Sequence, residues 1–257
     1  MKKVYSETAL GEIEYEYREG NPLVLFLKGF GSFDTAQSFS KISELLPDSY
    51  GIVAPNYLNC GFSGHSVQPY TIKDEAVEIA KIVNKLNASG VIIVAHSFGG
   101  VYAMYLKDMI NNVKAFVGIE PTTREIMTNP PREEAYLELE ENADEVQQQV
   151  MTKLFELFTK EEAENFLATT ERNASRFDDD ARQALAAAEE NDTYLQRDTK
   201  MQNMPTTIFT EAFRKNEYLR SEYLSDHPAS KVISIGTFQY LQWENPAEIA
   251  EAISGVF

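Results

Sequence analysis

Short apolar strands alternate with amphipathic helices along this chain, and no other feature limits its fold as much. Leu23–Leu27 and Val91–Ala95 are wholly apolar, as is typical of central strands that are buried on both faces. Thr71 can cap the helix that follows it, and Val113–Ile119 is a further strand. This alternation predicts an α/β protein with a mostly parallel central sheet and helices on both faces.

The alternation stops in the middle of the chain and then resumes. Before the break, we expect strands at Glu12–Tyr17 and Tyr50–Ala54 and helices at Asp34–Leu46 and Gly99–Ile110; after it, strands at Thr206–Thr210 and Lys231–Ile235 and helices at Phe213–Leu224 and Pro246–Ile253. Between Pro121 and about Met204 the pattern indicates helices only. We therefore predict an α/β core formed by residues 1–120 and 204–257, interrupted by a helical cap insertion at 121–203.

Charge and composition exclude several classes of function. The formal charge is −17, and the stretch from Glu120 to Thr193 contributes −13 of it, which disfavours binding of nucleic acid or anionic membranes. Cys60 is the one cysteine, and the three histidines are scattered, so we expect neither a metal site nor a cofactor. The start lacks an apolar leader, and no run has the roughly 20 apolar residues of a membrane span. We expect a cytoplasmic protein without a membrane or nucleic-acid partner, and the oligomeric state stays open.

The segment Val91–Gly100 carries the strongest chemical signal. A buried strand runs directly into His96, Ser97, Phe98 and Gly99, and a helix follows. This order matches a nucleophile elbow, a sharp turn that holds a serine hydroxyl at the tip of a strand and needs small neighbours. The alternative is an ordinary turn with a capping serine. The strand and helix on either side favour the elbow, which makes Ser97 the candidate nucleophile.

Two further segments support a family resemblance. Lys28-Gly-Phe30-Gly-Ser resembles the His-Gly-x-Gly-Ser loop of α/β hydrolases, and the stretch from Gly236 to Pro246 resembles their C-terminal Gly-x-x-His-Tyr-Leu-x-Trp-Glu-x-Pro segment. With the elbow, these matches cover nearly the whole chain, which is identified as a member of the α/β-hydrolase superfamily with a helical cap. The resemblance implies that the backbone N–H groups of Phe30 and Phe98 form the oxyanion hole.

The chain departs from this family at the catalytic base. The family histidine lies seven residues before the proline of the C-terminal segment, and Gln239 lies there instead. A serine is a weak nucleophile without an adjacent base, and an amide cannot take a proton. His65, in the loop after the strand ending at Ala54, is the first replacement candidate, and Lys28 is the second. Strand alternation points His96 away from the side that Ser97 faces, so we interpret it as a packed histidine.

The catalytic acid is also displaced. The usual aspartate position aligns with Arg214, whereas Glu211 lies three residues earlier at the strand end. Glu120 ends the strand before the insertion, where some members of the superfamily, such as certain haloalkane dehalogenases, carry their acid. Glu120 is therefore the first candidate and Glu211 the second. Either carboxylate can also simply cap the turn that follows it.

Three hypotheses for the function follow from these residues. The first is a serine hydrolase of the esterase or thioesterase type, acting on a small, largely apolar ester-like ligand with an atypical or incomplete catalytic triad. The second is a non-catalytic ligand-binding or regulatory protein on a hydrolase scaffold, which the residues at 28, 214, 239 and 242 favour. The third is a non-hydrolytic enzyme of the lyase type that uses the oxyanion hole without an acyl-enzyme.

Overall fold

One mixed sheet forms the centre of the protein. The structure is a computed structural model that describes residues 1–29, 33–132, 134–141, 143–176, 183–184, 186–188 and 199–256, with the backbone alone at 138–141, 143–147 and 176. Within these residues the strand order is β1-β2-β4-β3-β5-β6-β7-β8. The strands are β1 (Lys2–Glu7), β2 (Glu12–Arg18), β4 (Gly51–Pro55), β3 (Leu23–Leu27), β5 (Val91–His96), β6 (Val113–Ile119), β7 (Thr206–Thr210) and β8 (Lys231–Ser234). β1 pairs antiparallel with β2 and β2 with β4, and every later pairing is parallel, which confirms the predicted α/β class.

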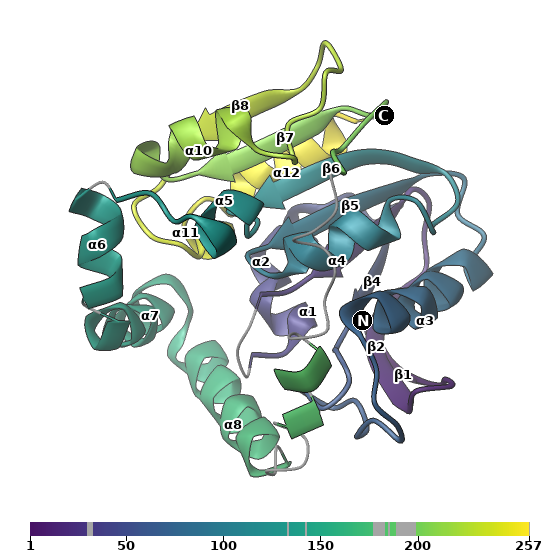
Figure 1. Ribbon diagram of the computed structural model, residues 1–257. Helices are drawn as coiled ribbons and strands as arrows, with labels where there is room; N and C mark the ends of the chain where they lie inside the picture. Colours follow the sequence, from purple (N-terminus) through teal and green to yellow (C-terminus); the bar gives the residue numbers. More distant parts are fainter. Residues whose placement is uncertain are drawn as a thin grey trace.

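Helices cover both faces of the sheet (Figure 1). One face is covered by α3 (Ile72–Lys85), α4 (Gly99–Leu106) and α10 (Lys215–Arg220), and the other by α1 (Thr35–Ser38), α2 (Ser40–Leu45) and α12 (Pro246–Ser254). Along β5, Ile93 and Ala95 belong to the first hydrophobic cluster, whereas Ile92 and Val94 belong to the second. Successive side chains of a strand point to opposite faces, so a strand covered on both sides must be apolar throughout.

Among the described residues between β6 and β7, helices are the only regular secondary structure. They include α5 (Arg124–Thr128), α6 (Glu134–Glu141), α7 (Ala143–Leu157) and α8 (Lys160–Arg176). Phe158, which directly follows α7, and Phe166 of α8 pack against Trp243 of α11 (Leu241–Glu244), with their ring centroids 5.5 and 5.7 Å from that of Trp243. This aromatic cluster fixes the α7–α8 pair against the loop that follows β8, and that loop carries Gln239.

Two of the elements that differ from the sequence expectation lie in the first half of the chain. The expected single helix at Asp34–Leu46 is divided into α1 and α2, because Phe39 leaves helical geometry (φ −112°, ψ 14°) and stacks on Phe26 at 4.6 Å. β1 was not expected at all, since Lys2–Glu7 has no apolar alternation and lies at the sheet edge with exposed or half-buried residues. Neither difference moves the carboxyl ends of the central strands.

The described part of the chain contains no helix both long and apolar enough to cross a bilayer.

The junction of β5 and α4 is crowded, and this generates the first prediction. A Cβ atom built on Gly99 would lie 2.3 Å from the Leu27 carbonyl oxygen, a backbone atom that cannot swing away. We expect Gly99→Ala to lower the free energy of unfolding by about 1–3 kcal/mol, as overpacking of a close-packed interior does.

The matched control is Gly255→Ala, at the end of α12, where the nearest atom would lie at 3.3 Å. We expect this control to leave the urea midpoint nearly unchanged. Equal midpoint shifts for the two variants would contradict the account of the junction.

Candidate active site

Ser97 occupies the turn between β5 and α4 in a strained backbone conformation. Its φ is +49°, in the left-handed region that non-glycine residues seldom adopt. Three backbone hydrogen bonds hold it there: its N–H donates to Ile119 at 3.1 Å, and its carbonyl accepts from Gly100 and Thr122, both at 2.9 Å. Such strain persists where the surroundings over-determine it, and it concentrates at functional sites. The side chain is half-buried and faces a cavity.

The loop after β3 approaches Ser97 closely. A Cβ atom at Gly29 would lie 2.8 Å from Cβ of Ser97, so this position requires glycine. Phe98 directly follows Ser97 and is the N-cap residue of α4. Its backbone N–H group therefore lies at the elbow. Phe30, the other expected oxyanion donor, lies outside the described residues. Lys28 is buried (3% exposed), and its carbonyl accepts a hydrogen bond from the Tyr57 hydroxyl at 2.9 Å.

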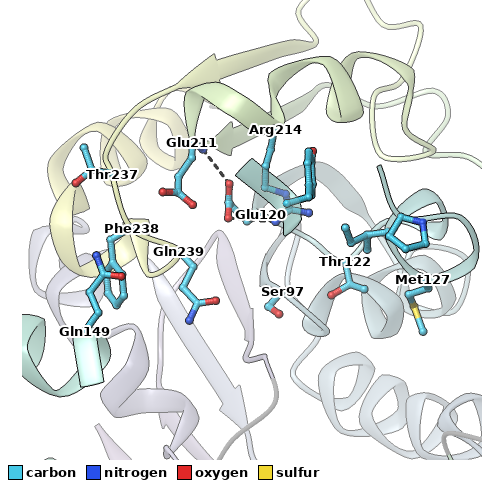
Figure 2. Close-up of a pocket in the computed structure, with 13 residues that line it drawn as sticks. Ser97, Glu120, Thr122, Met127, Gln149, Glu211, Arg214, Thr237, Phe238 and Gln239 are labelled. Carbon is cyan, nitrogen blue, oxygen red and sulfur yellow. Dashed lines mark hydrogen bonds and ion pairs between the residues drawn. The ribbon is translucent and has the colours of Figure 1, made fainter. Parts of the chain in front are cut away.

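A cavity of about 550 Å³ opens over Ser97 (Figure 2). Its wall combines residues from the strand ends, from the loop after β8 and from the helices between β6 and β7. The lining residues are Ser97, Glu120, Thr122, Ile126, Met127, Pro130, Tyr136, Gln149, Glu211, Arg214, Thr237, Phe238 and Gln239. The cavity therefore collects Ser97, Glu120, Glu211 and Gln239 from the expected site residues.

A buried ion-pair network closes one side of the cavity. Arg214 donates from Nη1 to Oε2 of Glu120 at 3.1 Å, and from Nη2 and Nε to the two carboxylate oxygens of Glu217 at 2.9 and 3.0 Å. Oε1 of Glu120 also accepts from the Thr210 hydroxyl at 2.9 Å and from the N–H of Glu211 at 2.8 Å. Glu217 further accepts from the Tyr136 hydroxyl of α6 at 2.8 Å. Both oxygens of Glu120 therefore already have donors.

Gln239 lies where the resemblance expects a histidine. Its side-chain amide extends toward Ser97 in Figure 2. Its backbone carbonyl lies 3.1 Å from Nε2 of His96, which must carry the proton because a carbonyl oxygen can only accept. Burial lowers the pKa of His96 to about 4, so this imidazole is neutral near pH 7. His96 thus fixes the backbone of the Gln239 loop.

Glu211 is a cavity-lining carboxyl group whose ionisation is altered by its surroundings. It is half-buried, and desolvation by burial together with the nearby charge of Glu120 raises its pKa to about 7. Arg214 lowers that pKa less than these two effects raise it. The carboxyl group therefore changes charge close to neutral pH.

The remaining histidines lie away from the cavity. His65 is exposed, and its carbonyl packs at Gly11 in the turn between β1 and β2. His227 is also exposed, and its Nδ1 accepts from the N–H of Ala229 at 3.2 Å. Neither belongs to the cavity lining, so the structure does not bring the first replacement base to Ser97.

Sequence reasoning missed most of the cavity wall. Tyr136, Ile126 and Met127 come from helices whose inward face no local pattern identifies. Arg214 had a signal, because it occupies the expected acid position, and its partner Glu120 was the first acid candidate, whereas no sequence signal pointed to its second partner, Glu217. Across the described residues, no three His, Cys, Asp or Glu side chains are grouped so that they could hold a metal ion.

A family model and solved structures of known proteins both match this chain. The model for the alpha/beta hydrolase fold matches residues 22–237. The crystal structure of Smu.1393c from Streptococcus mutans is similar with a TM-score of 0.85 and 25% identity, covering 99% of this chain and 97% of that one. The epoxide hydrolase VrEH1 from Vigna radiata has a TM-score of 0.66 at 16% identity, covering 99% and 97%, a likeness of fold alone.

One curated human relative matches a shorter stretch. The chain is 37% identical over 82 residues to a protein named serine hydrolase-like protein from Homo sapiens. This stretch is 31% of the chain and 39% of that protein, so the match spans well under half of the relative's length.

The ion-pair network yields a stability prediction. Arg214→Met keeps most of the side-chain volume but leaves Glu120 and Glu217 without their cation. We expect a loss of about 3–5 kcal/mol in the free energy of unfolding at pH 7, because a broken buried pair leaves uncompensated charge.

Arg220→Met serves as the control, since Arg220 pairs with Glu125 at 2.9 Å on the surface, with the arginine side chain 59% exposed. An exposed pair contributes under about 1 kcal/mol. Urea unfolding of both variants tests this, and an equally small loss for Arg214→Met would show that the network is not stabilising.

Proposed function

The chain belongs to the alpha/beta hydrolase fold family, and from that premise we propose that it is a serine hydrolase acting on a small, largely apolar ester or thioester. One observation carries the proposal: Ser97 is held at φ +49° on the elbow and faces a cavity of about 550 Å³. A serine in that position can attack a carbonyl carbon that enters the cavity.

The proposed reaction has two halves. The Ser97 hydroxyl oxygen bonds to the substrate carbonyl carbon while its proton passes to a base, and the carbonyl oxygen becomes an oxyanion. The N–H group of Phe98, with that of Phe30 as the resemblance implies, stabilises this oxyanion. The tetrahedral intermediate expels the protonated alcohol or thiol and leaves an acyl group on Ser97. Water then hydrolyses the acyl-enzyme by the same steps.

The cavity wall supports the proposed substrate class. Ile126, Met127 and Phe238 offer apolar surface. Glu120 and Glu211 add negative charge beside Arg214, the one cation among the described lining residues. Excess negative charge disfavours anionic ligands such as phosphorylated esters. A neutral acyl group of modest size fits this volume and polarity.

The helices between β6 and β7 are proposed to act as a cap on this cavity. α6 and α7 contribute Tyr136 and Gln149 to its wall, and α5 contributes Ile126 and Met127. In this proposal residues 121–203 form the cap, and residues 1–120 and 204–257 form the catalytic core.

A second candidate function is a non-catalytic ligand-binding or regulatory protein. The observation that favours it is the pair of changes at the base and acid positions. Gln239 cannot take a proton, and Arg214 lies in an ion pair with Glu120. A site with this composition can hold a ligand through the cavity without turning it over.

A fluorophosphonate probe and short p-nitrophenyl esters test the first function directly. We expect covalent labelling of wild-type protein and ester turnover above background, because the elbow exposes the Ser97 hydroxyl. Ser97→Ala is expected to lose both. Folded wild-type protein that neither takes the label nor cleaves any ester would contradict the hydrolase proposal.

Gln239→His separates the two candidate functions. We expect the parent to cleave the ester slowly and the variant to cleave it faster, because an imidazole beside Ser97 is a stronger general base. The matched control is Gln68→His, which adds a histidine at an exposed loop position and is expected to leave the rate unchanged. Turnover in the variant but none in the parent would instead favour the binding protein.

A further inference from the structure

The structure limits which group could take the proton of Ser97. Among the described residues that line the cavity, Glu120 and Glu211 are the ones that carry a carboxylate. Arg214 stays protonated, and burial together with a hydrogen bond to Glu217 raises the pKa of the Tyr136 hydroxyl far above neutral pH. His96 uses its Nε2–H on the Gln239 carbonyl, outside the cavity lining. The choice is therefore between two carboxylates.

Glu120 is poorly suited to this task because its acceptor capacity is used. It receives the Arg214 guanidinium, the Thr210 hydroxyl and the N–H of Glu211, and only 4% of it is exposed. A cation and two further donors thus occupy both oxygens of this carboxylate. A proton arriving at Glu120 would have to displace one of these donors.

Glu211 differs from Glu120 both in the hydrogen bonds of its carboxylate and in its burial. Its N–H bonds to Glu120, but its carboxylate has no hydrogen-bond partner among the described residues. It is half-buried at the end of β7 and lines the cavity. In Figure 2 its carboxyl group lies on the same side of the cavity as the Gln239 amide, which extends toward Ser97. The Glu211 carboxylate, which has no bonded donor among the described residues, therefore lines the same cavity as Ser97. The Gln239 amide, which can both donate and accept, lines it too.

We propose that Glu211 is the general base of this site and accepts the Ser97 proton through a water molecule that the Gln239 amide positions. This inference rests on the proposed hydrolase function. As the Ser97 oxygen bonds to the carbonyl carbon, its O–H bond breaks, the water takes that proton, and the water passes one of its own to Glu211. The protonated Glu211 returns a proton by the same route to the departing alkoxide or thiolate. In the second half Glu211 takes a proton from the attacking water.

The charged groups around Glu211 support this role. Those acting on it are Glu120 at the end of β6, Arg214 in the turn after β7 and Glu244 of α11, and both glutamates raise its pKa. With burial as the largest cause, that pKa lies at about 7. A general base works best when its pKa lies near the operating pH, whereas an ordinary carboxylate is too weakly basic. Because the ionised form is active, activity is expected to rise with pH through about 7 and then to level off.

A pH profile of kcat/KM for a short p-nitrophenyl ester, measured for wild type and Glu211→Gln, tests the proposal. We expect the wild-type value to rise about tenfold per pH unit on the acid side and to level above about pH 7. Glu211→Gln is expected to lower the plateau by about 100-fold or more and to remove the inflection, since a base contributes roughly 10² to 10⁴. Circular dichroism and the thermal midpoint check that the variant is folded.

Glu248→Gln is the matched control, because it removes one carboxylate at an exposed position of α12. We expect it to keep the wild-type rate and inflection. If Glu211→Gln keeps both as well, Glu211 is not the base. That outcome leaves the hydrolase proposal standing as long as the wild-type protein still takes the fluorophosphonate on Ser97. Absence of both labelling and turnover in the wild type would remove the two proposals together.

Gln239→Leu separates positioning from proton transfer. It removes the amide at similar volume while Glu211 remains. We expect a lower plateau with the inflection still near pH 7, because the titrating group is unchanged. A lost inflection in this variant, with Glu211→Gln unaffected, would contradict the assigned roles.

Discussion

The Arg214 guanidinium lies between two buried carboxylates, and the shape and charge of the cavity depend on this arrangement. It lies 3.1 Å from Glu120 and 2.9 Å from Glu217 and so joins the end of β6 to the helices after β7. One cation cannot balance two carboxylates, and the Thr210 and Tyr136 hydroxyls supply further donors. Because Tyr136 belongs to α6, the same network reaches the helical segment between β6 and β7.

The residues found where the family resemblance expects the base and the acid are physically consistent with each other. Catalysis by a histidine needs a carboxylate that stabilises the imidazolium. Here the acid position carries the cation Arg214, which also lies against Glu120. Gln239 lines the same cavity as that cation, and its amide is neutral. The remaining carboxylate in the cavity wall is Glu211, which has no bonded donor among the described residues.

Local patterns predicted the sheet and Ser97, because wholly apolar runs and a strand followed by serine and glycine are short-range signals. The strand Lys2–Glu7 escaped prediction, since it lies at an edge and buries no apolar face. Phe39 breaks an expected helix because its ring packs on a strand, which is a tertiary effect. The pairing of Arg214 with Glu120 spans 94 residues and depends on the adjacency of β6 and β7. A single sequence gives the two residues but not their contact.

The central claim is that Ser97 acts as a nucleophile although the family histidine is replaced by Gln239. The most direct measurement is peptide-resolved mass spectrometry of the protein quenched shortly after mixing with p-nitrophenyl acetate. The account predicts an acetyl group on the peptide that contains Ser97, absent from the Ser97→Ala variant. Acetylation confined to lysines, with the Ser97 peptide unmodified while the ester is consumed, would contradict it.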